Sequence, residues 1–190
     1  MAVLTREAAA ARGDELALAD DDDTRTWAQL DIRVNRLVHA LRDAGLGLGD
    51  TISVVAGNRN EWFEVALACS HAGVVFVPVS WHLVAPELAY IIEDSGSRAV
   101  LVGHRFTDVA AEALADPRSS AVELAVAIGA PGDTRFADFE AFLGSGSDDE
   151  PKDQAFGGPM FYTSGTTGHP KGVRSSLSSP EPGTPPEVWQ

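Results

Sequence analysis

The most informative part of this chain is the stretch of residues 161–173, which reads Phe161-Tyr-Thr-Ser-Gly-Thr-Thr-Gly-His-Pro-Lys-Gly-Val173. It combines three glycines, four serine or threonine hydroxyls and a lysine in one short segment. Glycines let a ligand approach the backbone closely, so that successive N–H groups can converge on an anion. Hydroxyls and an ammonium group add hydrogen bonds and positive charge. The composition therefore predicts a phosphate-binding loop.

The spacing of this stretch excludes a Walker A loop. That motif places a serine or threonine directly after its Gly-Lys pair, where the hydroxyl reaches magnesium. Here Lys171 follows Pro170 and precedes Gly172. A flexible Gly/Ser/Thr linker is also disfavoured, because the stretch follows the apolar run 159–162 and ends in Pro-Lys-Gly-Val.

The order Thr-Ser-Gly-Thr-Thr-Gly-x-Pro-Lys-Gly-Val resembles the phosphate loop of the adenylate-forming superfamily. This superfamily includes acyl-CoA synthetases, luciferases and the adenylation domains of peptide synthetases. Further matches make the resemblance cover most of the chain from about residue 16 to residue 173. They are Thr24–Leu30, Asn35–Leu37, Leu41–Gly45, Gly49-Asp50, Asn58, Ala72-Gly73, Val77–Val79, Pro86–Leu88 and Ile91–Ser95.

The resemblance implies a ligase of the acyl-CoA synthetase type. Such an enzyme uses ATP to activate a small carboxylic acid as an acyl-adenylate, and then transfers the acyl group to coenzyme A. By the same resemblance, the four hydroxyls donate hydrogen bonds to the β- and γ-phosphates of ATP. The glycines permit close approach of the backbone, and the lysine, the expected catalytic residue, compensates the developing charge. The expected nucleotide-binding residues are Thr163, Ser164, Gly165, Thr166, Thr167, Gly168 and Lys171.

Other motifs of the superfamily do not occur in the sequence. Members carry a Tyr-Gly-x-Thr-Glu segment whose glutamate binds Mg²⁺, an aspartate on the ribose and a lysine near the C-terminus. The sequence has no Tyr-Gly-x-Thr-Glu, and its only lysines are Lys152 and Lys171. We therefore expect an N-terminal fragment that is inactive alone, with the Mg²⁺ ligand beyond its end. Two alternatives stay open, a fragment of a peptide-synthetase adenylation domain and a truncated, non-catalytic nucleotide-binding or regulatory protein.

Composition places the chain among globular proteins of the cytoplasm. Its 190 residues are 44% hydrophobic, enough for one sizeable core. Fourteen basic and 28 acidic residues give a net charge of −14, which disfavours nucleic acid as a partner. No signal peptide is recognisable, and the longest apolar region, 65–81, is interrupted and too short to span a membrane. Cys69, the one cysteine, is expected to be buried and inert.

Hydrophobic periodicity predicts an α/β fold, with a mixed, mostly parallel sheet flanked by helices, as in the first part of the large N-terminal domain of an adenylate-forming enzyme. Thr26 and Gln29 form a capping box for a helix that ends at Gly45. Strands and helices then alternate. The expected strands are 15–19, 51–56, 74–79, 99–102 and 122–128, and the expected helices after the capped one are 61–71, 86–94, 108–114 and 136–143. The expected core comprises Trp27, Leu30, Leu37, Leu41, Val54, Val75, Val77, Ile91 and Leu101.

Several segments are predicted to lie outside this core. Residues 1–174 are expected to form a partial AMP-binding N-terminal domain, and 175–190 a Ser/Pro-rich tail that runs into a truncated helix capped at Thr184. Asp20–Asp23 is interpreted as a solvated turn rather than a cation site. The histidines lack the spacing of a zinc site, and His169 is expected to face solvent. The loop 163–168 is expected to be accessible and poorly ordered without nucleotide.

Overall fold

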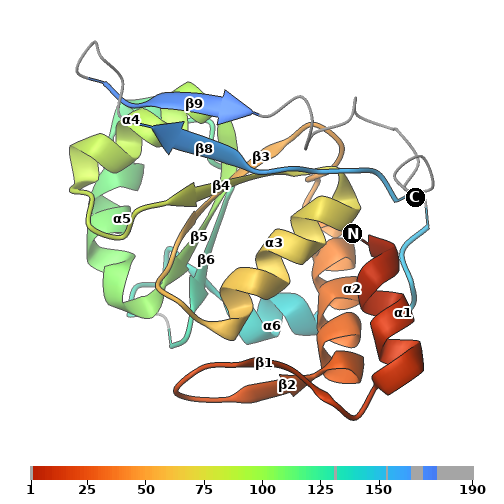
Figure 1. The fold of residues 1–190 in the computed structure, drawn as a ribbon. Coiled ribbons are helices and arrows are strands. Elements are labelled where there is room, and N and C mark those ends of the chain that lie inside the picture. Colours follow the sequence, from red (N-terminus) through yellow and green to blue (C-terminus); the bar gives the residue numbers. More distant parts are fainter. Residues whose placement is uncertain (1, 131, 153, 164–168, 175–190) are drawn as a thin grey trace.

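A parallel five-stranded sheet lies at the centre of the fold (Figure 1). The computed structural model describes residues 2–130, 132–152, 154–163 and 169–174, and the side chains from residue 5 onward. Within these residues the sheet has the order β4-β3-β5-β6-β7, and every neighbouring pair is parallel. The strands are β3 (Thr51–Val55), β4 (Val75–Val79), β5 (Ser97–Gly103), β6 (Leu124–Ile128) and β7 (Ala137–Asp138).

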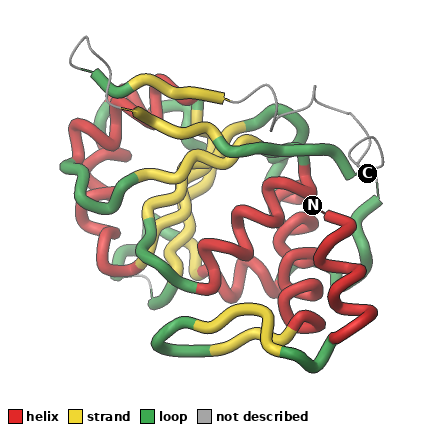
Figure 2. The backbone as a smooth tube through the Cα atoms, in the orientation of Figure 1, coloured by secondary structure: helices red, strands yellow, loops and turns green. Residues whose placement is uncertain are grey.

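Helices cover both faces of this sheet (Figure 2). One face packs against α2 (Trp27–Asp43), α3 (Asn60–Ala72) and α6 (Phe139–Gly144), with the first helix, α1 (Ala2–Arg12), beside α2. The other face packs against α4 (Ala85–Ser95) and α5 (Thr107–Ala115). Two short 3₁₀ turns, η1 (His104–Phe106) and η2 (Pro117–Ser119), flank α5. The remaining strands pair in two antiparallel hairpins, β1 (Leu16–Ala19) with β2 (Thr24–Thr26) and β8 (Met160–Thr163) with β9 (Lys171–Arg174).

The predicted capping box begins α2. The Gln29 amide N–H donates to Thr26 Oγ1 at 3.3 Å, and the Thr26 N–H donates to Gln29 Oε1 at 2.9 Å. Two N–H groups that would lack partners at a helix start are thereby satisfied. Gly45, with φ of 79°, takes the left-handed conformation that stops the helix.

The predicted fold class is confirmed, and the strands and helices predicted between β1 and α6 all occur in the predicted order. Most boundaries differ by one or two residues, and the largest difference is in the helix predicted for 136–143: residues 137–138 form β7, and α6 begins only at Phe139. The Asp138 side chain accepts the Ala141 N–H at 2.8 Å, and this N-cap fixes the later start. The sequence did not predict α1, β2 or β9. The tail 175–190 and its capping box at Thr184 lie outside the described residues.

The core agrees with the prediction except at one position. The eight aliphatic residues predicted for it are at most 3% exposed, and Cys69 is fully buried, which raises the pKa of its thiol to about 12. Trp27 is only partly buried. Its ring packs against the cluster on one side, and the Arg12 guanidinium lies 4.7 Å from its centre. The indole therefore lies between α1 and the core and is not itself fully buried in the core.

An ion cluster ties four elements together on the α2–α3 face. Glu64 of α3 is 0% exposed, and its carboxylate accepts from Arg33 at 2.6 and 2.9 Å and from Arg25 at 3.1 Å. Arg33 also donates to Glu140 of α6 at 2.6 and 2.9 Å. A buried carboxylate is tolerated only when it is paired in this way. The cluster therefore fixes how β2, α2, α3 and α6 meet.

Candidate functional site

The predicted phosphate loop connects the two strands of the β8–β9 hairpin. Thr163, the last residue of β8, lies directly opposite Lys171, the first residue of β9. Directly opposed residues of an antiparallel pair place their side chains on the same face, about 5 Å apart at Cβ. The structure therefore brings together a hydroxyl and an ammonium group at the point where the loop leaves and rejoins the hairpin. Residues Ser164, Gly165, Thr166, Thr167 and Gly168 lie outside the described residues.

The two faces of the hairpin have different environments. Side chains alternate along a strand, so Thr163 and Lys171 share their face with Phe161 and Val173. All four are exposed, with Phe161 at 53% and Val173 at 50%. Met160 and Tyr162 are on the opposite face and pack against the hydrophobic cluster between the sheet and α4–α5. The two site residues thus face solvent, while the other face of the hairpin holds it to the domain.

Helix α4 is hydrogen-bonded to β8 and to the residue directly before β9. The Tyr162 hydroxyl donates to Asp94 Oδ2 at 2.6 Å, and the Tyr90 hydroxyl donates to the Pro170 carbonyl at 3.0 Å. Tyr90 and Asp94 are four residues apart and therefore lie on the same side of α4. The rings of Tyr90 and His169 are 5.1 Å apart at 38°, while the imidazole remains exposed, as predicted. The helix thus contacts the residues before and after the loop.

The hydrogen bond of Tyr162 depends on a neutral phenol. Burial and the neighbouring Asp94 carboxylate both raise the pKa of the Tyr162 hydroxyl above its ordinary value. Its ring lies beside Gly172 on β9, where a Cβ atom would come 3.2 Å from Tyr162 Cζ and collide with the end of the Met160 side chain. Gly172 therefore leaves the space that the Tyr162 and Met160 side chains occupy.

The segment that leads into β8 is fixed along the edge of the sheet. The N–H groups of Ala155 and Gly157 donate to the carbonyls of His71 and Ser70 at 3.1 and 3.0 Å, and the Phe76 N–H donates to the Gly158 carbonyl at 3.1 Å. A Cβ atom at Gly157 would overlap the carbonyl oxygens of Cys69 and Val74. Glycine is therefore required where the segment passes over the junction of α3 and β4.

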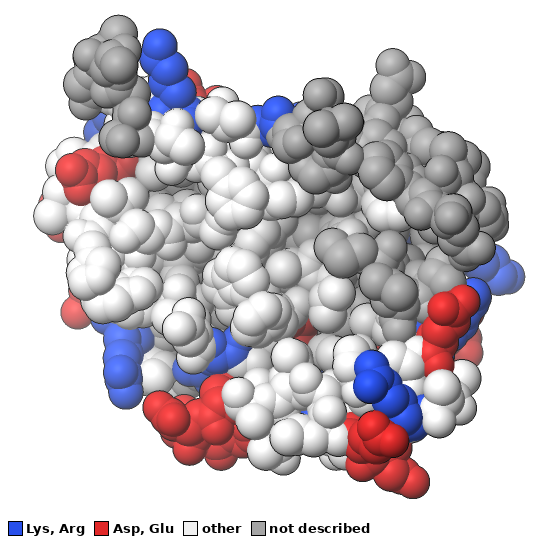
Figure 3. Space-filling model, viewed as in Figure 1, with Lys and Arg blue, Asp and Glu red and all other residues white. Residues whose placement is uncertain are grey.

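A cluster of acidic groups lies away from this hairpin. Figure 3 shows acidic side chains at the edge of the molecule near the β1–β2 hairpin, and mostly uncharged atoms across the middle of the same face. Asp20–Asp23 forms a turn there, as predicted: the Asp22 and Asp23 N–H groups donate to Asp20 Oδ1 at 2.9 and 2.8 Å. Among the described residues no group of three or more His, Cys, Asp or Glu could hold a metal ion. Nor does any helix in that part of the chain have the length and apolar character needed to cross a membrane.

Sequence reasoning found two of the residues that the structure brings together, Thr163 and Lys171, but missed the residues that position them. Tyr90, Asp94 and Gly157 carry no local motif, because their partners lie elsewhere in the chain: 80 residues away for Tyr90 and 68 for Asp94. Only the i, i+4 spacing of Tyr90 and Asp94 on an amphipathic helix could have indicated a shared role.

Sequence comparison gives one consistent family. Residues 5–179 match the family described as AMP-binding enzyme. A fatty acid–[acyl-carrier-protein] ligase, ScoC, from Streptomyces coeruleorubidus is 38% identical over 154 residues, which are 79% of this chain and 28% of that protein. A feruloyl-CoA synthase from an Amycolatopsis species is 36% identical over 152 residues, 78% of this chain and 27% of that protein. The long-chain-fatty-acid–CoA ligase FadD13 of Mycobacterium tuberculosis is 34% identical over 157 residues, 80% of this chain and 29% of that protein.

Solved structures agree with the sequence comparison. A fatty acyl CoA synthetase from Mycobacterium tuberculosis superposes with a TM-score of 0.77 at 27% identity, over 90% of this chain and 33% of that chain. An anthranilate CoA ligase, AuaEII, in complex with anthranoyl-AMP superposes with a TM-score of 0.81 over the same shares. At 21% identity the second match shows the fold alone.

The chain spans less than a third of the length of the three relatives named above. The match to the family nevertheless covers nearly all of this chain, including the β8–β9 hairpin and the loop between its strands. The three relatives of this chain named above are, by their names, acid ligases or synthases. The chain therefore belongs to the family of AMP-binding enzymes.

Proposed function

We propose that this region supplies the phosphate-binding hairpin of an ATP-dependent acid–CoA ligase, which activates a carboxylic acid as an acyl-adenylate and transfers it to coenzyme A. One observation carries the proposal: Thr163 and Lys171 lie opposite each other on the solvent-facing side of β8–β9, at both ends of the glycine- and hydroxyl-rich loop. Hydroxyl and ammonium donors are suited to phosphate oxygens. The resemblance to adenylate-forming enzymes and the names of the relatives support the same reaction.

Within that reaction, the proposed task of this chain is to bind and neutralise phosphates. The carboxylate attacks the α-phosphate of ATP and takes the adenylyl group, the bond between the α-phosphorus and the bridging oxygen breaks, and negative charge accumulates on the departing pyrophosphate. Thr163 and Lys171 are held by a paired hairpin, so they can stabilise this charge without first being ordered. The loop residues Ser164 to Gly168 are proposed to add backbone and hydroxyl donors. Lys171 is the proposed catalytic residue.

The remaining parts of the reaction are assigned to other segments. Mg²⁺ is proposed to bind the glutamate of a Tyr-Gly-x-Thr-Glu segment, which residues 1–190 do not contain. The acid-binding pocket is likewise proposed to lie beyond the phosphate loop. A chain with only one wall of the nucleotide site cannot align the attacking carboxylate, so we propose that residues 1–190 alone do not form an acyl-adenylate.

The acceptor thiol is proposed to be that of coenzyme A, as in the names of FadD13 and feruloyl-CoA synthase. ScoC, by its name, uses an acyl carrier protein, so the acceptor is a point to test. The relatives named above are ligases for coenzyme A or a carrier protein, and we therefore do not favour a peptide-synthetase adenylation domain. A non-catalytic nucleotide-binding or regulatory role remains as an outcome of the same test.

The direct test is carboxylate-dependent exchange of labelled pyrophosphate into ATP. It is measured with the 190-residue chain and with a protein in which this region is followed by the rest of a ligase of the relatives' length. We expect exchange only from the longer protein, and acyl-CoA on addition of coenzyme A. Acyl transfer to a carrier protein but not to coenzyme A would show that the proposed acceptor is wrong and that the carrier protein is the acceptor. ATP binding without exchange by the longer protein, across a panel of fatty and aromatic acids, would favour the non-catalytic role.

A further inference from the structure

The parallel sheet continues past β4 into the β8–β9 hairpin. A parallel bridge pairs Phe76 of β4 with Pro159, directly before β8, and Figure 1 shows the hairpin along that edge of the sheet. Continued over two residues of each strand, this register places Phe161 beside Pro78. On its other side, Phe161 is paired with Val173 of β9.

One row of apolar residues therefore crosses the sheet from β6 to β9. In order, it consists of Val126, Leu101, Val54, Pro78, Phe161 and Val173. Residues that lie side by side in neighbouring strands point to the same face of a sheet. The first three are 0% exposed, because they belong to the hydrophobic cluster under α2, α3 and α6. At the other end of the row, Phe161 and Val173 are 53% and 50% exposed and belong to neither hydrophobic cluster of the described residues.

The uncovered apolar surface extends onto α3. The ring of Trp62 meets that of Phe76 edge-on with 4.9 Å between their centres, and the ring of Phe63 lies 5.0 Å from that of Trp62. Phe63 itself is 48% exposed. Figure 3 shows mostly uncharged atoms across the face between β8 and α3. We call the surface formed by Phe63, Phe161 and Val173 the outer apolar face. An extended exposed apolar surface of this kind marks a site where something binds.

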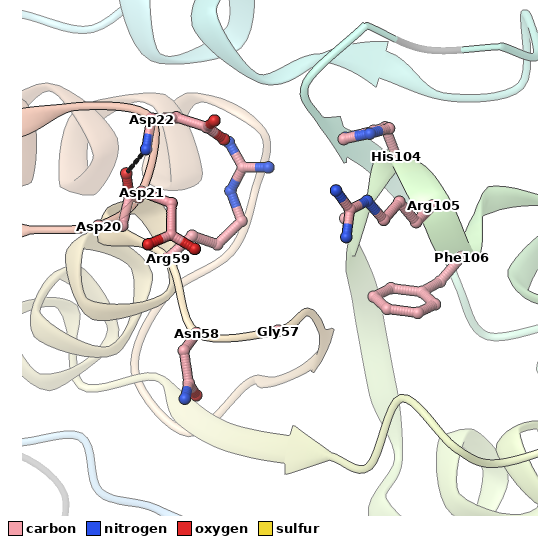
Figure 4. A pocket seen from close by; sticks show the side chains of 10 residues that line it. Asp20, Asp21, Asp22, Gly57, Asn58, Arg59, His104, Arg105 and Phe106 are labelled. Atoms are coloured by element: carbon pink, nitrogen blue, oxygen red, sulfur yellow. Dashed lines mark hydrogen bonds between the residues drawn. The ribbon is translucent and has the colours of Figure 1, made fainter.

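A cleft elsewhere on the molecule has a different character. It has a volume of about 220 Å³, lies at the carboxyl ends of β3 and β5, and is lined by Asp20–Asp22, Gly57–Arg59 and Gly103–Phe106 (Figure 4). Phe106 is the one large apolar side chain among these lining residues. Burial of apolar area drives most protein association, so an apolar segment would pack on the outer apolar face and not in this charged cleft.

The N-terminal domain of a relative is more than twice as long as the region that matches this chain. In a crystal structure of the N-terminal domain of FACL13 from Mycobacterium tuberculosis, the match covers 90% of this chain but only 42% of that chain, with a TM-score of 0.74 at 28% identity. More than half of that domain thus lies outside the match. This chain leaves β9 at Arg174, directly after Val173, so a following segment would begin beside the outer apolar face.

We propose that the outer apolar face is an interface within the complete domain, and that it is covered by the part of the domain that residues 1–190 do not contain. An apolar surface of that part packs on Phe161 and Val173. It thereby continues the hydrophobic cluster under α2, α3 and α6 to the last strand of the sheet. This packing requires neither ATP nor acyl transfer, so it can occur whether or not the protein is a ligase.

A second copy of the chain fits this face less well. Lys171 and Arg174 flank Val173 on β9, and both are exposed. Two copies that meet through the same surface bring these cations together, and each chain carries a net charge of −14. Charge repulsion thus favours another part of the same protein as the occupant.

Cysteine labelling tests this packing, because the one cysteine of the chain does not react. Cys69 is buried, and its thiol has a pKa of about 12. Phe161→Cys and Val173→Cys each place a reactive thiol on the outer apolar face. Their rates of alkylation by iodoacetamide are measured by peptide mass spectrometry, without nucleotide, acid or coenzyme A. The 190-residue chain is compared with the longer protein in which the rest of a ligase follows this region.

We expect rapid alkylation of both thiols in the 190-residue chain. In the longer protein a covered thiol reacts only when the interface opens, so alkylation should be slower by at least about a hundredfold. Glu112→Cys is the matched control. Glu112 is exposed on α5, which covers the opposite face of the sheet, and a thiol there should react at the same rate in both proteins.

Val173→Glu detects the same contact through stability. In the 190-residue chain the new carboxylate faces water, so the melting temperature should change by less than about 2 °C. In the longer protein the charge is buried at the interface, and the melting temperature should fall by at least about 5 °C.

Equal alkylation of Phe161→Cys and of Val173→Cys in the two proteins would overturn the proposal. Slow alkylation in the 190-residue chain that becomes fast on dilution would overturn it in favour of a second copy as the occupant. Protection of the longer protein only after addition of ATP or a fatty acid would overturn it in favour of a bound ligand. Protection without ligand, in a longer protein that shows no pyrophosphate exchange, would support the packing and contradict the proposed ligase function.

Discussion

The hydroxyl of Tyr162 donates a 2.6 Å hydrogen bond to Oδ2 of Asp94, a residue 68 positions earlier in the chain. This bond joins β8 to the last turn of α4, on the face of the hairpin opposite Thr163 and Lys171. A paired hairpin with one face bound to a helix can hold its other face in a fixed orientation. The bond therefore helps to fix the orientation of the hairpin face that carries Thr163 and Lys171.

Removal of either partner should weaken the attachment of the hairpin. We expect Tyr162→Phe and Asp94→Ala each to lower the free energy of unfolding by about 0.5–1.5 kcal/mol, the usual net value of one hydrogen bond. Urea unfolding followed by fluorescence measures this. The double variant should cost less than the sum of the two single variants, since both remove the same bond. Strictly additive losses would show that the bond contributes nothing to stability.

Tyr90→Phe should loosen the end of the loop without disturbing the rest of the domain. The substitution removes the 3.0 Å bond to the Pro170 carbonyl and keeps the ring that packs near His169. Faster amide hydrogen exchange is expected at Lys171 and Gly172, with unchanged exchange in β3 and β5. Tyr90→Leu, which removes the aromatic ring as well, should give a larger effect at the same amides. Equal exchange in the parent chain and Tyr90→Phe would rule out an anchoring role for the hydroxyl.

Gly157→Ala should be strongly destabilising although it adds only one methyl group. The new Cβ would overlap the backbone carbonyls of Cys69, in the last turn of α3, and Val74, directly before β4, and these cannot move independently. We expect a loss of about 1–3 kcal/mol or more in the free energy of unfolding. Gly144→Ala is the matched control, because a Cβ there meets nothing within 4 Å. Similar stabilities for the two variants would contradict the proposed close approach.

Asp20 should make stability depend on pH in the acid range. Hydrogen bonds from backbone N–H groups, that of Asn60 first, lower the pKa of the Asp20 carboxyl below its ordinary value of 3.8. The folded state therefore binds this proton less readily than the unfolded chain. The stabilisation is present above pH 3.8 and is lost as the pH falls below that value toward the folded-state pKa.

Asp20→Asn should accordingly make the curve of melting temperature against pH flatter below about pH 4. Asp21→Asn serves as control, because its carboxylate accepts no hydrogen bond from the described residues. Parallel curves for the parent chain and Asp20→Asn, measured by circular dichroism, would show that the carboxylate does not titrate differently on folding.

The sequence predicted those helices and strands that are specified by residues close to one another in the chain. The Thr26–Gln29 box and the periodicity of Leu30, Leu37 and Leu41 were sufficient for α2, because a helix is closed by contacts three and four residues apart. The alternation of short apolar runs with amphipathic segments was sufficient for the parallel sheet. Thr163 and Lys171, which the structure places opposite each other, were predicted as site residues from the composition of the loop and its resemblance to a known one.

The features that could not be predicted from the sequence depend on contacts between segments that are distant in the chain. Strand β9 has only four residues, Lys171–Arg174, with a glycine in the middle, and it exists because it pairs with β8. Trp27 appeared to be a core residue by its spacing, but its position next to Arg12 depends on how α1 packs. A cleft lined by Asp21, Asp22 and Arg105 lies where the β1–β2 turn meets the chain after β5, and its position requires the strand order, which no single segment encodes.

Lys171 and Lys152 allow a direct test of the proposed catalytic residue, because they are the only two lysines of the chain and both are exposed. Lys171 lies at the mouth of the loop opposite Thr163, whereas Lys152 lies in the segment that precedes β8.

In a ligase of the relatives' length that contains this region, Lys171→Ala should slow pyrophosphate exchange by roughly ten- to a thousandfold. This corresponds to the loss of one transition-state contact of about 1.4–4 kcal/mol. Lys171→Arg should recover part of the rate, because it keeps the charge but changes its geometry. Lys152→Ala should exchange at the parent rate. If Lys171→Ala also exchanged at that rate, the ammonium group would have no part in stabilising the departing pyrophosphate, and the catalytic assignment of Lys171 would be wrong.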